Sequence, residues 1–299
     1  MALVAQRSIT IVFPAYNEEA NIAKAVAQAT QCIERLCPDW EIIVVNDGSK
    51  DHTGTIVDGL ASNDTRVIPI HHPVNRGYGA ALKSGIQRAS KELVFFCDAD
   101  LQFHLSEIIL MLTWIEQFDM VIGCRAKRRD TLHRRLNALG WKMLVRLLLG
   151  LKVQDIDCAF KLFRNVVFRA VQIDAVGAMV NTDILVQATR MGFRLKEVPV
   201  THFPRLHGSQ TGANLRVIVK AFKELFRLYY KLRTVHTVVY EDDRRHRQQD
   251  TPTNRRRTDR RQAMLPINFP DRRHRVLRLG SAEIPLDNFA GAPSMPKEQ

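Results

Sequence analysis

The first 125 residues alternate short apolar runs with stretches in which apolar residues recur every three or four positions. A short apolar run that ends at turn residues indicates a buried strand, and a spacing of three or four indicates an amphipathic helix. The runs predict strands at residues 8–14, 41–46, 66–72, 92–97 and 120–125. The spacing predicts helices at residues 21–36, 53–61, within 75–89 and at 106–117, the last capped by Ser106. This alternation predicts an α/β fold, with a mostly parallel sheet covered by helices on both faces.

Polar residues follow the predicted strands at the points where the strands end. The segment ELVFFCDADLQ, residues 92–102, places Asp98 and Asp100 directly after a strand that is apolar on both faces. If the extended conformation persists, both carboxylates point to one side of the chain, and the Gln102 amide oxygen follows on the same side. Such oxygens suit Mg²⁺ or Mn²⁺ and leave positions for substrate phosphates. A solvated acidic turn is the alternative interpretation of this short motif.

Three other strand ends carry groups that suit a nucleotide. Tyr16 offers an aromatic ring to a base, and the carboxylates of Glu18 and Asp47 can accept hydrogen bonds from a base or ribose. Residues 75–79, NRGYG, offer backbone N–H groups to phosphate but lack the lysine of a P-loop. Ordinary turn chemistry is the alternative for each of these groups, and a tight turn is the alternative for residues 75–79.

Length and composition indicate one large domain with an appendage. The chain has 299 residues, of which 45% are hydrophobic and 25% charged. Its N-terminus lacks the pattern of a signal peptide, and Arg or Lys interrupts every apolar run before 18 residues, so we expect neither a signal peptide nor a membrane-spanning helix. The five cysteines are scattered and predict neither a disulfide framework nor a zinc site, which suits a reducing cytoplasm.

The net charge of +13 predicts an anionic partner: nucleic acid, a membrane surface or a phosphorylated substrate. Residues 131–149 and 214–233 are basic and amphipathic, which is typical of segments that lie at a membrane interface. In the first segment, one apolar face is expected to contain Leu136, Leu139, Met143, Leu147 and Leu148. The alternative is that both segments pack on the domain with their basic faces in water. Nucleic acid is disfavoured because only 7% of residues are aromatic and no binding motif is present.

The composition changes near residue 241, where Arg, Asp and Pro become frequent and sustained periodicity ends. We therefore expect a folded domain over residues 1–240 and a basic, largely disordered tail over residues 241–299. The pattern leaves open whether the chain associates with a second copy of itself.

Six motifs in order, FPAYNEE, VNDGS, NRGYGAALKSG, DADLQ, GCR and DCAFKLFR, resemble family 2 glycosyltransferases of the GT-A fold, in particular the dolichol-phosphate mannose synthase-like group. The resemblance covers about residues 7–235. It implies metal-dependent, inverting transfer of a sugar from a GDP- or UDP-sugar to a polyprenyl phosphate or related lipid-linked acceptor, at the cytoplasmic face of a membrane.

The resemblance also implies roles for single residues. Pro14, Tyr16, Glu18 and Asp47 would hold the nucleoside, Asp98, Ala99 and Asp100 would contact the nucleotide sugar, and Asp98, Asp100 and Gln102 would share Mg²⁺ or Mn²⁺. Arg125 matches a G-x-R strand end. Arg205 and Gly208 match the R-x-x-G pattern of a loop that closes over the diphosphate. The family usually has a lysine further along this loop, where the present chain has Thr211.

The acceptor decides whether a general base is needed. A lipid phosphate is already anionic, whereas a hydroxyl must lose a proton, and Asp157 is then the candidate base. Asp157 as a structural carboxylate paired with an arginine is the alternative. Three other functions stay open: transfer to a hydroxyl of a glycan or small metabolite, nucleotidyl transfer, and a catalytically silent module that binds nucleotide sugars.

Overall fold

The computed structural model describes residues 7–125, 140, 143–177, 179–204, 215–234, 276–279 and 282–285; for residues 215–221, 233–234, 276–279 and 282–285 it describes the backbone alone. The chain divides into two units, Met1–Val239 and Tyr240–Gln299. In the second unit, β8 (Val276–Leu279) and β9 (Ala282–Pro285) form an antiparallel hairpin. The first unit contains the main sheet.

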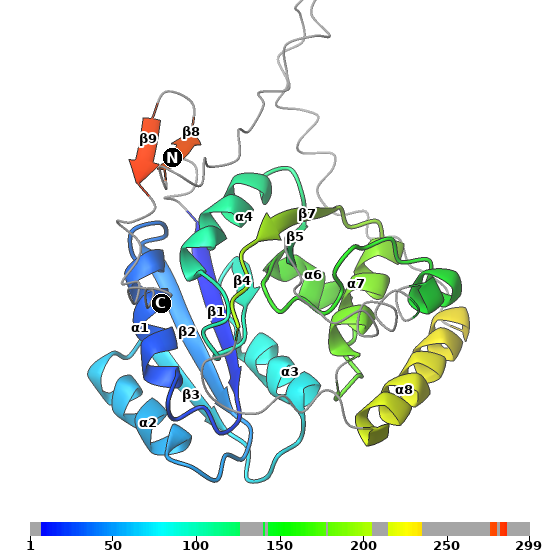
Figure 1. The fold of residues 1–299 in the computed structure, drawn as a ribbon, viewed down its shortest axis with the longest axis horizontal. Coiled ribbons are helices and arrows are strands. Elements are labelled where there is room, and N and C mark those ends of the chain that lie inside the picture. The colour runs from blue at the N-terminus through cyan, green and yellow to red at the C-terminus, as the bar shows by residue number, and fades with distance from the viewer. Residues whose placement is uncertain are drawn as a thin grey trace, which may run out of the picture. The chain divides into compact units, whose positions relative to one another are not determined.

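A seven-stranded sheet with the order β3-β2-β1-β4-β6-β5-β7 forms the centre of the first unit (Figure 1). Its strands are β1 (Ser8–Ala15), β2 (Asp39–Asn46), β3 (Val67–His71), β4 (Leu93–Phe96), β5 (Met120–Arg125), β6 (Lys161–Arg164) and β7 (Leu195–Val200). β6 runs antiparallel to its neighbours β4 and β5, and the other pairs are parallel. The five predicted strands and the mostly parallel sheet are confirmed. β6 and β7 were not predicted, because both give weak periodic signals. β6 has only four residues and begins with a lysine, and β7 is interrupted by charged residues and by Pro199.

Helices follow most of the strands. They are α1 (Ile22–Ile33), α2 (Thr53–Asn63), α3 (Tyr78–Arg88), α4 (Ile108–Trp114), α6 (Asn165–Ala170), α7 (Val180–Arg190) and α8 (Leu215–Thr234). The prediction that Ser106 caps the fourth helix is wrong. Ser106 lies inside a 3₁₀ turn, Leu105–Glu107, and α4 begins after that turn with no side-chain cap. The buried Leu105 anchors this turn, so the chain begins to coil before the α-helix starts.

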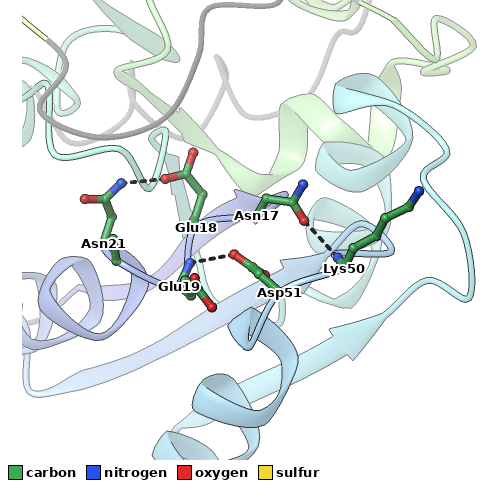
Figure 2. Close-up of a pocket in the computed structure, with 7 residues that line it drawn as sticks. Asn17, Glu18, Glu19, Asn21, Lys50 and Asp51 are labelled. Atoms are coloured by element: carbon green, nitrogen blue, oxygen red, sulfur yellow. Dashed lines mark hydrogen bonds between the residues drawn. The ribbon is translucent and has the colours of Figure 1, made fainter.

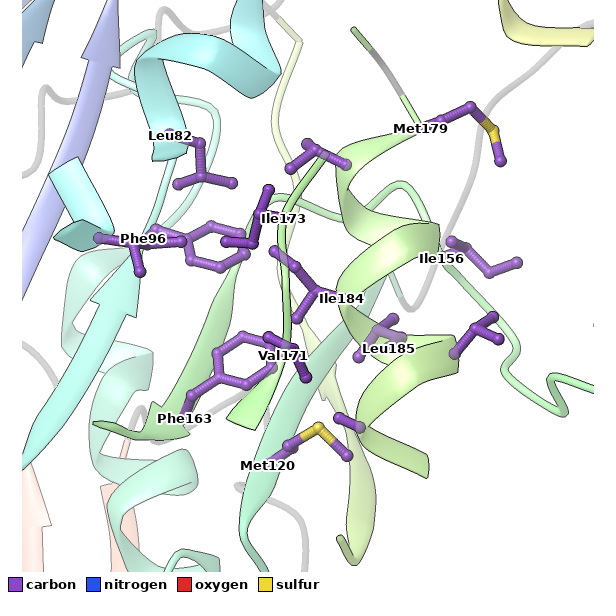
Figure 3. Close-up of a cluster of buried hydrophobic side chains, with 14 of the residues drawn as sticks. Leu82, Phe96, Met120, Ile156, Phe163, Val171, Ile173, Met179, Ile184 and Leu185 are labelled. Carbon is purple, nitrogen blue, oxygen red and sulfur yellow. The ribbon is translucent and has the colours of Figure 1, made fainter. Parts of the chain in front are cut away.

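Both faces of the sheet are covered, as the apolar runs predicted. Successive strand residues point to opposite faces. On one face, Val12 and Phe96 join a buried cluster with residues of α3, α7 and α8, and Figure 3 shows Leu82 of α3 and Ile184 of α7 meeting strand residues there. Ile11 and Phe95 point to the other face and are also buried. No residue of α1 or α4 belongs to the cluster on the first face.

Strand β4 is rigidly packed between its neighbours. All four of its residues are completely buried, and the Phe96 ring stacks on Phe163 of β6 with centroids 5.6 Å apart. Burying one phenylalanine side chain stabilises the fold by about 1.5–3 kcal/mol. The strand therefore presents the acidic segment that follows it from a fixed position.

The predicted apolar face of residues 131–149 is wrong in one respect, as the helical residues 143–149 show. Met143 and Leu147 are 73% and 82% exposed, whereas Leu148 packs against the buried cluster, so Leu148 does not share their face. Each residue turns an α-helix by about 100°, which separates positions 147 and 148. Leu136 and Leu139 lie outside the described residues. In the part of the chain that the structure describes, no helix combines the length and apolar character needed to cross a membrane.

Candidate active site

Four strands end at one edge of the sheet, and the predicted site residues follow them. β1, β2 and β4 are parallel neighbours, and β5 runs parallel to them because β6 lies antiparallel between β4 and β5. Tyr16, Asp47 and Asp98 lie in the segments after β1, β2 and β4, and Arg125 is the last residue of β5, so all four stand at this edge. Open α/β sheets bind their ligands at such an edge. The antiparallel β6 begins at the same edge, with Lys161.

The chain turns sharply after β4, so the extended conformation assumed for Asp98 and Asp100 does not persist. Leu101 adopts the left-handed conformation, with φ at +61°, and the Gln102 N–H donates to Oδ1 of Asp100 at 3.2 Å. Asp100 is 6% exposed and Asp98 is half-buried. The argument from a shared side of a strand is therefore wrong, because these residues lie in a turn. We call residues 98–102 the acidic turn.

Gln102 is held in place by residues far along the chain. Its Nε2 donates to the main-chain oxygen of Phe203 at 2.9 Å, and the Phe203 N–H donates to the Gln102 main-chain oxygen at 2.8 Å. Since the amide nitrogen is bound to Phe203, the amide oxygen is the end of this side chain that suits a metal ion. Phe203 also lies just before the predicted diphosphate loop, whose residues Arg205, Gly208 and Thr211 lie outside the described residues.

The side chains of the acidic turn have the donor atoms that suit a hard divalent cation. Asp98, Asp100 and Gln102 offer only oxygen ligands, the kind that Mg²⁺ and Mn²⁺ prefer. Within residues 7–125, 140, 143–177, 179–204 and the described part of α8, no group of three or more His, Cys, Asp or Glu side chains is arranged to hold a metal. Two carboxylates plus phosphate oxygens are the usual way in which Mg²⁺ is held in phosphate-binding enzymes.

Two neutral side chains border Asp98. Burial, and then the charge of Asp98, raises the pKa of the Tyr78 hydroxyl well above its usual value. The same two causes raise the pKa of the Cys97 thiol. Both groups are therefore protonated at neutral pH, and Cys97 cannot serve as a thiolate nucleophile.

The loops after β1 and β2 enclose a pocket of about 410 Å³, lined by Asn17, Glu18, Glu19, Ala20, Asn21, Lys50 and Asp51 (Figure 2). Oε2 of Glu18 accepts a hydrogen bond from Nδ2 of Asn21 at 2.7 Å, and Oδ1 of Asn17 accepts one from the Lys50 N–H at 2.8 Å. Of the predicted nucleoside residues, Glu18 lines this pocket, Tyr16 is 41% exposed beside it, and Pro14 is buried within β1.

Asp47 is bound to the glycine-rich loop rather than directed into the pocket. Its Oδ1 accepts from the Arg76 N–H at 3.0 Å and its Oδ2 from the Gly77 N–H at 2.8 Å. Nδ1 of His72 lies 2.6 Å from the same Oδ1, and Nε2 of His72 lies 2.9 Å from the Ser84 hydroxyl. The carboxylate is 3% exposed, so both oxygens hold the loop in shape.

The glycine-rich loop directs its N–H groups to the protein itself. Besides the two bound to Asp47, the Gly79 and Ala80 N–H groups donate to the Val176 main-chain oxygen at 3.1 and 3.3 Å. A side chain at position 79 would lie 2.6 Å from the Ala175 oxygen, and Gly77 has φ at +99°, so both glycines are needed for this shape. The loop is thus a tight turn, and these four N–H groups are not directed at a phosphate.

Arg125 forms a two-point ion pair with Asp155. Its Nε and Nη2 donate to the two carboxylate oxygens at 2.6 and 2.7 Å. Burial alone would lower the pKa of Arg125, but these hydrogen bonds outweigh burial and raise it. Sequence spacing cannot decide whether Asp155 or Asp157 is the partner of Arg125, since both carboxylates lie in one short segment. The structure buries Asp155 and exposes Asp157.

The fold identifies the class of protein. Glucosyl-3-phosphoglycerate synthase from Mycobacterium tuberculosis, solved with Mn²⁺, uridine diphosphate and phosphoglyceric acid, matches with a TM-score of 0.58 at 19% identity, over 79% of this chain and 81% of that one. A second structure of that enzyme, with phosphoglyceric acid, matches with a TM-score of 0.57 at 20% identity, over 77% and 81% of the two chains. The predicted GT-A fold of a glycosyltransferase is thereby confirmed.

The sequence identifies the family. Residues 10–172 match the model described as "Glycosyl transferase family 2", so the chain belongs to family 2 of the glycosyltransferases and is an enzyme of that family. Dolichyl-phosphate beta-glucosyltransferase ALG5C of Trichomonas vaginalis is 35% identical over 171 residues, 52% of this chain and 51% of the relative. Undecaprenyl-phosphate 4-deoxy-4-formamido-L-arabinose transferase of Pectobacterium atrosepticum is 29% identical over 220 residues, 71% of this chain and 64% of the relative.

These relatives fit the dolichol-phosphate mannose synthase-like group that the motifs indicated. The chain spans about half to two thirds of the length of these two relatives.

Proposed function

We propose that this enzyme transfers a sugar from a GDP- or UDP-sugar to a polyprenyl phosphate, using Mg²⁺ or Mn²⁺, and that residues 1–240 form the transferase domain. The observation that carries the proposal is the acidic turn, in which Asp98, Asp100 and Gln102 follow β4 at the edge of the sheet, with Gln102 bonded to Asp100 and to Phe203. The polyprenyl-phosphate acceptors in the names of the two curated relatives support the acceptor class. The metal and the diphosphate in the neighbouring crystal structures support the donor side.

The donor is proposed to lie across the carboxyl ends of β1, β2 and β4. Tyr16 stacks on the base, Glu18 and the surrounding pocket hold the nucleoside, and the acidic turn holds the diphosphate through the divalent ion. When bound, that ion neutralises the charge that develops on the leaving diphosphate. Asp98 and Asp100 act as ligands rather than as bases. Asp47 acts by holding the glycine-rich loop, since both of its oxygens are bound there.

The acceptor phosphate is proposed to attack the anomeric carbon in line, with inversion. Because a phosphate is anionic at pH 7, no side chain has to remove a proton. Transfer to a hydroxyl is the second candidate function, favoured by the exposure of Asp157 at the same edge of the sheet.

The membrane surface is the proposed location of the acceptor. Phe222, Phe226 and Tyr230 recur every four residues on α8 and are 39%, 48% and 64% exposed, so they form one apolar face. Lys223 and Arg227 are exposed beside them. An apolar face bordered by basic residues is typical of a helix that lies in the interface of an anionic membrane, here the cytoplasmic face.

The test is release of nucleoside diphosphate by the purified full chain. A panel of GDP- and UDP-sugars is supplied with Mn²⁺, with and without a short polyprenyl phosphate, and chelator-treated samples serve as controls. We expect release that requires both the metal and the lipid phosphate. Release that responds only to hydroxyl acceptors would favour the second candidate, and donor binding without any release would indicate a silent module.

A further inference from the structure

Lys161 is a completely buried lysine at the edge of the sheet that carries the site. Its exposed fraction is 0%, and it is the first residue of β6, paired with Phe96 of β4 and Ile122 of β5. Lysine is almost never fully buried, because transfer of an ammonium group out of water is strongly unfavourable unless the group is paired. A completely buried lysine at the start of an inner strand therefore requires an explanation.

The ammonium group binds a single loop. Nζ donates to the main-chain oxygen of Ile156 at 3.0 Å and also to that of Cys158. These two oxygens lie on either side of Asp157. Burial lowers the pKa of Lys161, while the charges of Asp157, Asp155 and Asp98 oppose that shift. The ammonium group therefore lies among the carboxylates of this edge.

The same loop is held from its other side by Arg125. Asp155 is fixed by the two-point ion pair, and Ile156 and Cys158 are buried, so Asp157 is the exposed residue of the segment 155–158. Two cations from adjacent strands thus fix a loop that presents one carboxylate to solvent. A loop that only connects two elements does not need two cations to fix its backbone, because connecting loops tolerate changes in sequence and conformation.

The strand order indicates which substrate Asp157 faces. The nucleoside pocket is built from the loops after β1 and β2, on one side of β4, whereas the loop 155–158 precedes β6, on the other side. A donor that extends from the pocket to the acidic turn ends with its sugar near β4. The acceptor must then approach from the side of β6 and β5.

We propose that Lys161 is a positioning residue for the acceptor side of the reaction: it binds the carbonyl groups on both sides of Asp157 and so fixes that carboxylate on the side of β4 from which the acceptor approaches. There Asp157 orients the acceptor, and it takes a proton only if the acceptor is a hydroxyl. The inference rests on the proposed function only in taking the reaction to be sugar transfer at this edge. It assigns Lys161 no contact with substrate.

The experiment compares Lys161→Met, which keeps the length but removes the charge, with Lys161→Arg, which keeps a donor, in the full-length enzyme. Turnover and the KM values for donor and acceptor are measured separately, and binding of the nucleoside diphosphate with Mn²⁺ is followed by its effect on the melting temperature. We expect Lys161→Met to lower turnover at least tenfold or to raise the acceptor KM by that factor. The donor KM and the thermal shift should stay within about twofold of wild type, and Lys161→Arg should restore part of the loss.

A double mutant distinguishes positioning from mere stability. If Lys161 acts through Asp157, then Lys161→Met has little further effect on turnover in an Asp157→Asn background. If Lys161→Met does not fold, Lys161→Arg is combined with Asp157→Asn in the same way. Full additivity of the two changes, or loss of donor binding in parallel with turnover, would overturn the inference. Absence of transfer by the wild-type enzyme to any acceptor would instead overturn the proposed function.

Discussion

The side-chain amide of Gln102 and the main-chain oxygen of Phe203 are joined by a hydrogen bond of 2.9 Å, and a second bond of 2.8 Å joins their main chains. These bonds attach the acidic turn after β4 to the segment after β7. A divalent ion bound at the turn would therefore lie on a segment that is hydrogen-bonded to Phe203, two residues before the proposed diphosphate loop. The proposed metal ligands and the proposed diphosphate loop can each be tested by substitution.

Asp100→Asn is expected to lower turnover by at least about 100-fold while the protein stays folded. Asparagine can still accept the hydrogen bond from the Gln102 N–H, so the turn is preserved, but it removes an anionic ligand from a hard cation. Turnover across a range of Mn²⁺ concentrations and the melting temperature are measured together. An enzyme within about threefold of wild type would exclude Asp100 as a metal ligand.

Arg205→Ala is expected to reduce turnover more than Thr211→Ala does. Only the guanidinium group offers a charge and several donors to a diphosphate, and the lysine that is usual further along this loop is absent. Steady-state kinetics with saturating acceptor give the comparison. Small and equal effects of the two substitutions would mean that residues 205–211 do not bind the diphosphate.

Arg125→Ala is expected to destabilise the folded state by about 3–5 kcal/mol, since it leaves the buried Asp155 carboxylate without its guanidinium partner. The double mutant Arg125→Ala with Asp155→Ala should recover part of that loss because it removes the unpaired charge. Urea denaturation measures both. Arg194→Ala is the matched control: its ion pair with Asp119 is exposed and 3.8 Å long, so the change should be small. Equal effects at the two arginines would contradict this account.

Thiol reactivity provides a test of the fold. None of the five cysteines, all of them in the described part of the chain, forms a disulfide; Cys124 is half-buried and the other four are buried. Burial raises the pKa of Cys32 and Cys158 to about 12 and that of Cys37 to about 11, and it also raises the pKa of Cys97. Because the thiolate is the reactive form, a chromogenic disulfide reagent at pH 8 should modify one thiol quickly in the native enzyme and five after denaturation. Cys124→Ser should abolish the fast phase.

The strand pattern was predictable where burial alone dictates it. β4 is apolar at each of its four positions because it packs on both faces, and such runs are unambiguous. β6 was missed because its first residue is Lys161, whose burial depends on carbonyl groups of a loop that only the folded chain brings to it. A charged residue at that position argues against a buried strand in any reading of the sequence alone.

The chemistry of the site was predictable by residue type but not by partner. The acidic turn and Arg125 lie at the predicted edge of the sheet. The left-handed conformation of Leu101 and the pairing of Arg125 with Asp155 could not be predicted, because neither produces a periodic pattern in the sequence. The same holds for Asp47, whose oxygens accept from N–H groups 29 and 30 residues further along the chain. Hydrogen bonds between distant backbone and side-chain groups arise from tertiary packing, which composition and spacing do not encode.

Binding to liposomes is expected to require anionic lipid and to weaken as salt is raised, because exposed charges are screened within about 10 Å at 0.1 M ionic strength. The residues to change are those that the structure exposes. Phe222→Ser with Phe226→Ser removes apolar side chains from the outer face of α8 and should weaken binding about tenfold, while donor hydrolysis persists.

Two controls accompany this membrane experiment. Val74→Ser removes another exposed apolar side chain, at 64% exposure, from a loop outside α8 and should leave binding unchanged. Leu148 is unsuitable for this experiment because it packs against the buried cluster. A chain that ends at residue 240 should still sediment with anionic liposomes if α8 carries the interaction. Binding lost only with residues 241–299 would assign the membrane contact to the second unit, and binding by neither form would favour an acceptor in solution.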